Sequence, residues 1–180
     1  MPIGRSPRGQ SAATGIEVGR IRAGEVSALR DLRLASLRTD PLAFGRTYER
    51  EAALRDADWI ALTADVAAGG GAGFIALVDA APQGLCMALA LRDAGDGASG
   101  LFAMSVAPVA RGRRAGEALV AAAVAAARLA GAPALRLLVT QPTAARLYAR
   151  CGFVDDGRRE RLEHPPGVVE VGMPLDLAGS

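Results

Sequence analysis

The sequence predicts an α/β fold in which helices cover a mixed sheet. Segments with the pattern of strands alternate along the chain with segments that have the pattern of helices. The chain has 180 residues, of which 51% are hydrophobic and 22% are charged, as is typical of a globular protein with one substantial core. We expect residues 1–15, which are rich in Gly, Pro, Ser and Arg, to form a disordered tail. Residues 16–177 are expected to form a single domain.

The expected elements follow from periodicity and from residues that end or begin helices. In chain order they are a strand at 16–21, helices at 25–38 and about 48–66, strands at 73–80, 85–91 and 101–106, an alanine-rich helix ending at Gly131, a strand at 135–140, a short helix between Pro142 and Gly152, and strands at 153–159 and 168–175. Apolar and polar residues alternate in the first strand, whereas the run 73–80 is apolar enough for a buried strand. The order implies one sheet with helices packed against it.

Proline and glycine set most of the predicted boundaries. Asp40 precedes a proline, and the residue before a proline is disfavoured in a helix, so the first helix is expected to end there. The sequence Pro82-Gln83-Gly84 is interpreted as the turn of a hairpin. Gly131, with a proline two residues beyond, is a common helix C-terminus, and Pro142 stands where a first helical residue would.

The segment Leu101–Gly116 is the most informative part of the sequence. It combines a short strand, a break marked by proline, a turn rich in Gly and Arg, and the start of a helix. A helix N-terminus leaves backbone N–H groups unpaired, and these groups attract anions. Arg111, Arg113 and Arg114 add three permanent cations whose forked donors suit phosphate oxygens. The segment is therefore either a cradle for a pyrophosphate or a solvated basic turn, and its own residues do not decide between the two.

Composition excludes several classes of protein. The chain contains no lysine, so all 21 basic residues are arginine, which excludes a phosphate-loop lysine and a Schiff-base lysine. Two cysteines and one histidine make neither a disulfide framework nor a recognisable zinc cluster, and no metal is expected. The net charge of +2 does not imply binding to nucleic acid or membrane, and no segment is predicted to span a membrane. We expect a cytoplasmic protein and, from the absence of lysine and asparagine, a bacterial GC-rich genome.

From Leu101 to Phe153 the chain resembles the GCN5-related N-acetyltransferase (GNAT) superfamily. The acyl-CoA motif of that family, Arg or Gln, two residues, Gly, one residue, then Gly or Ala, follows a strand that ends in Val-x-Pro. The residues that carry the resemblance are Val106-Ala107-Pro108, Arg111 and Gly116, followed by Gln141, Leu147-Tyr148 and Gly152-Phe153. The residues Asp40-Pro41-x-Ala43-Phe44, with Trp59 further on, resemble a subgroup of mostly uncharacterised bacterial members.

The resemblance implies a mostly antiparallel sheet that is splayed between its fourth and fifth strands, and acetyl-CoA as co-substrate. The pantetheine arm would then bind as an added strand. Residues assigned to the cofactor by the resemblance are Met104, Ser105, Val106, Arg111, Gly112, Arg113, Arg114, Ala115, Gly116, Glu117, Gln141 and Tyr148. The N–H of Met104 would polarise the thioester carbonyl, and Tyr148 would act as general acid for the departing sulfur. The expected activity is direct transfer of an acetyl group to a primary amine of a small molecule or peptide.

Two positions depart from the family pattern, and the general base is not assigned. Arg114 stands where the family has its first glycine, so its side chain either crowds the pyrophosphate or supplies charge that holds it. Gln141 replaces the usual asparagine and keeps the amide. Candidates for the base are Asp93, Asp96, Glu170 and His164, each of which is also typical of an ordinary surface residue. Water could relay the proton instead.

Two functions from other classes stay open at this stage. One is an acyl-CoA-binding or regulatory domain on the same fold that lacks catalysis, favoured by Arg114, Gln141 and the absence of a carboxylate in the strand 101–106. The other is an arginine-rich nucleic-acid binder, whose affinity would fall steeply with salt. The expected partners are acetyl-CoA and an amine acceptor, without nucleic acid or membrane, in a monomer or homodimer.

Overall fold

The structure is a computed structural model that describes residues 15–68, 71–163 and 166–178. Most of the expected N-terminal tail, residues 1–14, lies outside the described residues. The elements are β1 (Ile16–Arg20), α1 (Val26–Thr39), η1 (Pro41–Ala43), α2 (Tyr48–Ala52), α3 (Asp56–Ala68), β2 (Gly71–Val78), β3 (Ala81–Ala90), η2 (Arg92–Ala94), β4 (Ser99–Val106), η3 (Pro108–Ala110), α4 (Ala115–Leu129), β5 (Ala134–Val139), α5 (Pro142–Arg150), β6 (Arg159–Arg161) and β7 (Val169–Asp176). In the described part of the chain, no helix is both long and apolar enough to cross a membrane.

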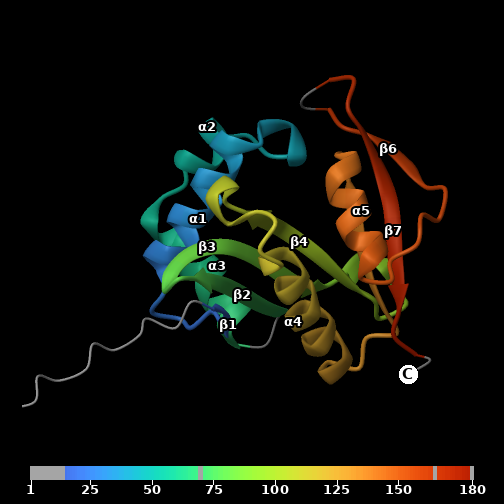
Figure 1. The fold of residues 1–180 in the computed structure, drawn as a ribbon, viewed down its shortest axis with the longest axis horizontal. Coiled ribbons are helices and arrows are strands. Elements are labelled where there is room, and N and C mark those ends of the chain that lie inside the picture. The colour runs from blue at the N-terminus through green and yellow to red at the C-terminus, as the bar shows by residue number, and fades with distance from the viewer. Residues whose placement is uncertain (1–14, 69–70, 164–165, 179–180) are drawn as a thin grey trace, which may run out of the picture.

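The described strands form one seven-stranded sheet in the order β1-β2-β3-β4-β5-β7-β6 (Figure 1). Neighbouring strands are antiparallel except for β4 and β5, which are parallel. A parallel neighbour requires a crossover connection, and α4 supplies it between β4 and β5. The predicted mixed, mostly antiparallel sheet with flanking helices is confirmed.

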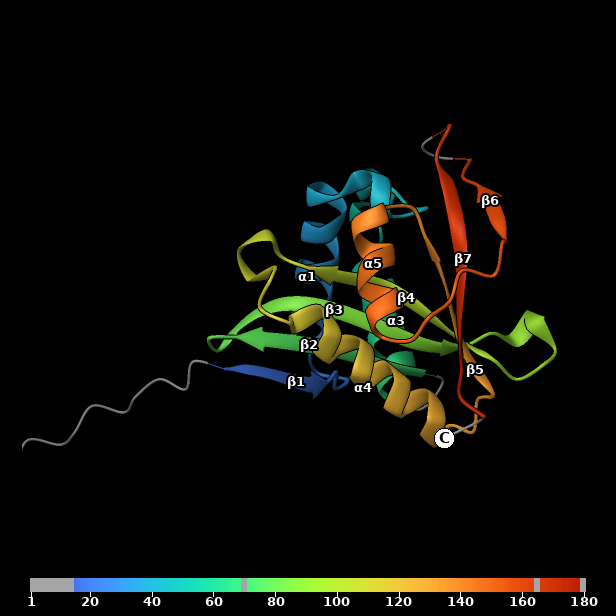
Figure 2. The ribbon, with the colours of Figure 1, turned by 45° about the vertical axis from the view of Figure 1, so that its right-hand side comes forward.

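Helices cover both faces of the sheet around β2 and β3. Alternate residues of β2 point in opposite directions, so Phe74 packs in the core cluster that includes Leu119 of α4, whereas Ile75 packs with Leu29 of α1 and Val66 of α3. In Figure 2, α4 crosses the near face of the sheet and α1 and α3 lie behind it. Burial on both faces explains why the sequence of β2 is an almost continuous apolar run.

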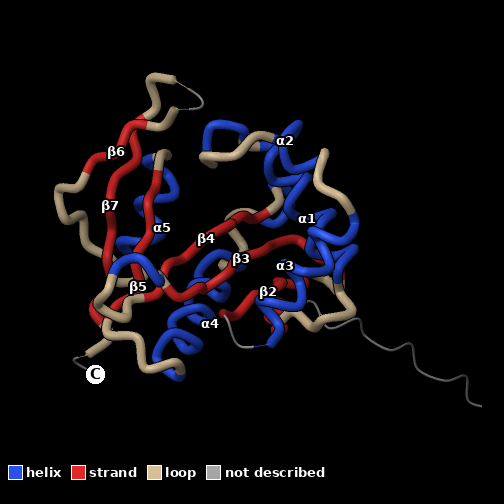
Figure 3. The backbone as a smooth tube through the Cα atoms, turned by 180° about the vertical axis from the view of Figure 1, so that it is seen from behind, coloured by secondary structure: helices blue, strands red, loops and turns tan. Residues whose placement is uncertain are grey.

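The fourth and fifth strands part soon after they meet. β4 pairs with β5 through Ser99 and Gly100 alone in the described register, and Figure 3 shows the two strands running apart beyond that end. On its other edge, β4 contains a bulge, because the register with β3 shifts between Leu85 and Met87. Ala103 lies in the bulge with a φ of 51°. A bulge bends its strand and increases its twist, so it turns β4 away from β5.

The predicted hairpin turn was wrong by three residues. Pro82 and Gly84 lie inside β3, and the turn is formed by Asp79 and Ala80, whose φ angles are 52° and 64°. The pairing of Val78 with Ala81 shows a two-residue loop, which favours positive φ at both central residues. The sequence Asp-Ala lacks the Asn-Gly or Asp-Gly pattern that usually marks this turn. The sequence Pro-Gln-Gly is more typical of a turn, which is why the prediction fell on the wrong residues.

The single helix expected over residues 48–66 is divided into α2 and α3. Thr47 begins α2 and accepts a hydrogen bond from the N–H of Arg50 at 3.4 Å. A second helix start follows, because the carboxylate of Asp58 accepts the backbone N–H of Arg55 at 3.0 Å. A side chain that reaches back in this way stabilises a new N-terminus, and the chain is therefore free to change direction between the two helices.

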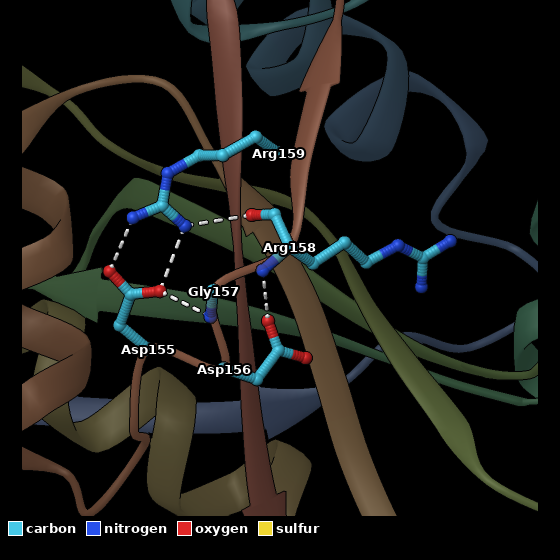
Figure 4. A network of polar contacts seen from close by, with 5 residues as sticks. All are labelled: Asp155, Asp156, Gly157, Arg158 and Arg159. Atoms are coloured by element: carbon cyan, nitrogen blue, oxygen red, sulfur yellow. Dashed lines mark hydrogen bonds and ion pairs between the residues drawn. The ribbon is translucent and has the colours of Figure 1, made fainter.

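The last predicted strand pair was partly wrong. Residues 153–158 are irregular, and the strand β6 begins at Arg159. Figure 4 shows the reason: Asp155 accepts the N–H of Gly157, and Asp156 accepts the N–H of Arg158, both at 2.9 Å. Such aspartate turns compete with strand pairing, and Gly157 adopts a φ of 84°.

A buried ion pair joins α1 to α2. The guanidinium of Arg33 donates from Nε to Glu51 at 2.8 Å and from Nη2 to the same carboxylate at 2.7 Å. The two side chains are 9% and 8% exposed. The Arg33 guanidinium also lies 4.7 Å from the centre of the Phe44 ring, which follows η1. The pair therefore holds α2 and the segment around η1 against α1.

Glu51→Gln is expected to lower the free energy of unfolding by about 3 kcal/mol, because it leaves a buried guanidinium without its counter-charge. Urea denaturation measures the loss. Asp155→Asn is the control, since Asp155 binds Arg159 with the same two-bond geometry at 2.9 and 2.8 Å but the side chains are about half exposed. A loss as large in the control as in Glu51→Gln would contradict burial as the cause.

Candidate functional site

A cleft lies where β4 and β5 have separated. It has a volume of about 440 Å³. One wall is formed by the end of β4, the loop after it and the first turn of α4, and the other by the end of β5 and by α5. Asp40, Ala43 and Phe44, from the end of α1 and from η1, also line the cleft. The cleft therefore joins the loop of arginines to the separated strands.

The structure brings together the residues that the resemblance assigns to the cofactor, with one exception. Those that line the cleft are Met104, Ser105, Val106, Arg111, Gly112, Arg114, Ala115, Gly116, Glu117, Gln141 and Tyr148. The exception is Arg113, whose guanidinium binds both carboxylate oxygens of Asp79 in the β2–β3 turn. This hydrogen bond lowers the pKa of Asp79. Arg113 thus points toward the hairpin and does not line the cleft.

Arg111 belongs to the loop of arginines, and its guanidinium contacts two other segments of the chain. Its Nε donates to the carbonyl of Val106 at the end of β4, at 3.0 Å, and its Nη2 donates to the carboxylate of Asp40. Asp40 ends α1, and its side chain is 23% exposed. A single guanidinium therefore connects β4, the loop and α1.

Arg114 begins α4 in a conformation that favours glycine. Its φ is 65° and its ψ is 10°, in the left-handed region, which explains physically why a glycine suits this position. The side chain is 84% exposed and its Nε donates to Glu117 at 2.7 Å. This bond, and a weaker one from Arg150 at 3.3 Å, lower the pKa of Glu117. The side chain of Arg114 therefore extends along the surface toward Glu117, and most of it is exposed to solvent.

Gly116 allows a close approach between α4, β4 and α5. A Cβ atom at this position would lie 3.0 Å from Cδ2 of Leu147 and 3.4 Å from Cε of Met104. The first of these separations is tighter than ordinary van der Waals contact. The missing side chain therefore allows α4 to pack closely against Leu147 and Met104, which both line the cleft.

Tyr148 has one side in the core and lines the cleft. The residue is 7% exposed, and its ring packs edge-to-face against Phe153 with 5.8 Å between centroids. Burial raises the pKa of the Tyr148 hydroxyl above its usual range, and the nearby thiols of Cys86 and Cys151 act in the same direction. The phenol therefore keeps its proton at neutral pH and is a hydrogen-bond donor. Within the described residues, no group accepts that hydrogen bond.

Of the sequence-based candidates for the general base, the three that the structure describes do not line the cleft. Asp96 lies before β4, where it accepts the N–H of Ala98 at 3.1 Å and binds Arg136, and these bonds lower its pKa. Asp93 lies in the same loop, in η2. Glu170 is on β7, where burial and the neighbouring Glu160 raise its pKa. His164 lies outside the described residues.

The carboxylates that do line the cleft, among the described residues, are those of Asp40 and Glu117. Sequence reasoning used Asp40 to end a helix and as part of a subgroup pattern, but it did not assign Asp40 to the site. The pairing with Arg111 spans 71 positions, so no local pattern could reveal it. The described residues contain no cluster of His, Cys, Asp or Glu that could hold a metal ion.

Comparisons with known proteins agree with this geometry. A family model described as "Acetyltransferase (GNAT) domain" matches residues 59–155, which is more than half of the chain. The protein therefore belongs to the GNAT acetyltransferase family. A search of curated proteins finds no match.

Solved structures with low sequence identity share the fold. The putative acetyltransferase yncA from Salmonella typhimurium, solved with its cofactor acetyl-CoA, has a TM-score of 0.74 at 15% identity, covering 91% of this chain and 94% of that one. A GNAT acetyltransferase from Streptococcus pneumoniae has a TM-score of 0.76 at 16% identity, with 90% and 99% covered. A phosphinothricin acetyltransferase from Sinorhizobium meliloti, solved in complex with AcCoA, has a TM-score of 0.75 at 18% identity, with 89% and 88% covered.

Replacing Arg114 separates its backbone strain from its side-chain contacts. Arg114→Ala removes the bond to Glu117 but keeps a side chain at a φ of 65°, whereas Arg114→Gly also relieves the left-handed conformation. We expect the Gly variant to be more stable than the Ala variant by about 1 kcal/mol, measured by urea denaturation. Equal stability of the two variants would show that the loop relaxes and that position 114 carries no strain.

Proposed function

We propose that this protein is an acetyl-CoA-dependent N-acetyltransferase that acetylates a primary amine of a small molecule or peptide by direct attack. The observation that carries the proposal is the cleft at the separation of β4 and β5, which borders an unpaired strand edge and the N-terminus of α4. Family membership and the solved relatives that hold acetyl-CoA support it. Acetyl-CoA would supply the acetyl thioester.

The residues present fit an acyl-CoA. Beyond Gly100, β4 has no partner strand on its β5 side in the described register, so backbone groups of Met104, Ser105 and Val106 are suited to an amide-containing arm. The loop from Arg111 to Gly116 ends at the N-terminus of α4, where free N–H groups and the helix dipole favour a pyrophosphate. Arg114 contributes charge there without filling the cleft, because its side chain is 84% exposed.

In this proposal, two groups act on the reacting atoms. The N–H of Met104 would donate a hydrogen bond to the thioester carbonyl as negative charge develops on that oxygen. Tyr148 would donate a hydrogen bond to the departing sulfur. Because burial raises the pKa of Tyr148, stabilisation of the thiolate by a hydrogen bond is favoured over full proton transfer. The acceptor amine would lose its proton to water or to a carboxylate that lines the cleft.

The alternative function is an acyl-CoA-binding or regulatory domain without catalysis. Release of free thiol from acetyl-CoA in the presence of a panel of primary amines separates the two, since a binder would gain thermal stability without turnover. The proposal also includes a bacterial source, a cytoplasmic location and a monomeric or homodimeric state. Cell fractionation would test the location, and light scattering would test the oligomeric state. Thermal stabilisation by acetyl-CoA with no thiol release from any amine of the panel favours the binding domain.

Gly116→Leu is expected to abolish stabilisation by acetyl-CoA, because a larger side chain would displace Leu147 and Met104, which line the cleft. The rise in melting temperature on adding acetyl-CoA is the measurement, with far-UV circular dichroism to show that the fold persists. Gly24→Leu is the matched control, since a Cβ at Gly24 meets no atom within 4 Å. Unchanged stabilisation in Gly116→Leu would place acetyl-CoA elsewhere.

Tyr148→Phe is expected to lower the acetylation rate by about 10²–10³-fold, the usual effect of removing one hydrogen-bond donor to developing negative charge, while KM for acetyl-CoA holds. The ring and its packing on Phe153 remain, so the loss reports on the hydroxyl. Thiol release with an amine taken from the panel measures the rate. The other tyrosine, Tyr48, binds Arg38 on the surface, and Tyr48→Phe should leave the rate unchanged. A wild-type rate in Tyr148→Phe, with chemistry rate-limiting, would return Tyr148 to a purely structural role.

A further inference from the structure

We propose that Asp40 is a positioning residue for the acyl-CoA site and that it acts through Arg111. This inference rests on the proposed function. Asp40 belongs to the segment between α1 and α2, whereas Arg111 belongs to the loop that would hold the pyrophosphate. Their ion pair would fix that loop before the ligand arrives, and so raise the affinity for acyl-CoA.

Backbone hydrogen bonds hold Asp40 in place within its own segment of the chain. Its N–H donates to the carbonyl of Ser36 at 2.9 Å, and its carbonyl accepts the N–H of Ala43 at 2.9 Å. Helix α1 is anchored in turn by Leu29 and Leu37, which are 0% and 1% exposed. Asp40 is therefore held in place on its own segment, and its carboxylate anchors the loop through Arg111.

Arg111 passes this constraint to the loop. Its Nη2 binds Asp40 while its Nε binds the carbonyl of Val106 at 3.0 Å, so the guanidinium is held at two places. The residues that follow include Gly112 at a φ of 77° and Arg114 at a φ of 65°. A φ of 65° is uncommon for arginine in a free chain, although glycine adopts such angles readily, so ordering this backbone costs conformational entropy. A loop that is ordered in advance spares acyl-CoA that cost.

The same segment also reaches the opposite strand. The hydroxyl of Thr140, just after β5, donates to the carbonyl of Leu42 in η1 at 3.0 Å. Residues 40–42 therefore contact both arms of the separated sheet, β4 through Arg111 and β5 through Thr140. This bridge places Asp40 at the point where the ligand loop and the α1–α2 segment meet.

Charge alone predicts the opposite effect, which makes the inference testable. A carboxylate near a phosphate-binding loop repels the ligand, so removing it should tighten binding. Asp79 provides the comparison, because it binds Arg113 of the same loop but lies outside the cleft. Replacing either aspartate by asparagine removes one negative charge beside the loop, but of the two aspartates Asp40 alone binds an arginine that lines the cleft, namely Arg111.

The experiment measures the dissociation constant of CoA by isothermal titration calorimetry for the full chain. Asp40→Asn is expected to weaken CoA binding by about 5–10-fold, which is within the usual coupling between contacting residues. Asp79→Asn should bind CoA as tightly as wild type or more tightly. In an Arg111→Gln background, Asp40→Asn should cause no further loss, because the contact it removes is already absent. Asp40→Glu, which keeps the carboxylate, should recover part of the affinity.

Several results would overturn the inference. If the Asp40→Asn variant binds CoA as tightly as wild type, Asp40 does not position the site. If Asp40→Asn weakens CoA binding as much in the Arg111→Gln background as in wild type, Asp40 does not act through Arg111. The melting temperature of each variant is measured without ligand to show that the variant folds. If Asp40→Asn fails to fold, Asp40→Glu and Arg111→Gln still test the same contact. A wild-type protein that does not bind CoA would overturn the proposed function as well, so the two failures are distinguishable.

Discussion

The separation of β4 from β5 is the constraint on which the site depends. Parallel pairing begins at Ser99 and Gly100, and the bulge at Ala103 then turns β4 away. Since unpaired strand edges attract other backbone groups, natural sheets usually cover them. Here the edge is kept open next to a helix N-terminus, and η1 and α5 border the opening. Ala103, at a φ of 51°, packs against the buried cluster that includes Leu85 and Met87.

The arginines around the cleft form ion pairs with carboxylates, and each carboxylate directs its arginine to a different place. Arg113 is directed away from the cleft by Asp79, Arg114 lies along the surface with Glu117, and Arg111 is directed inward by Asp40. In a chain without lysine, every one of these cations has a planar fork that binds a carboxylate in a fixed orientation. The loop is therefore shaped by ion pairs as well as by its glycines.

Sequence reasoning found the fold and most of the cleft because both depend on local patterns. The strand, turn and helix of residues 101–116 are adjacent in the chain, and their spacing matches a family motif. What it missed depends on contacts between distant segments or on backbone that the residue type does not suggest. Asp40 meets Arg111 across 71 positions, and alanine at 80 and 103 gives no hint of a positive φ. The sequence predicts Arg113 in the cleft because the residues on either side of it are predicted there. The ion pair with Asp79 instead holds its side chain outside the cleft.

Tyr148 shows why a core residue and a site residue need not be alternatives. Its ring belongs to the buried cluster that α4 and the sheet share, and Phe153 fixes its orientation. The same burial raises the pKa of the hydroxyl, so the group that lines the cleft is a protonated phenol that is held rigidly. A donor that is fixed before the reaction stabilises developing charge better than one that must reorganise. On the proposed function, the packing that makes Tyr148 part of the core is what would make its hydroxyl effective.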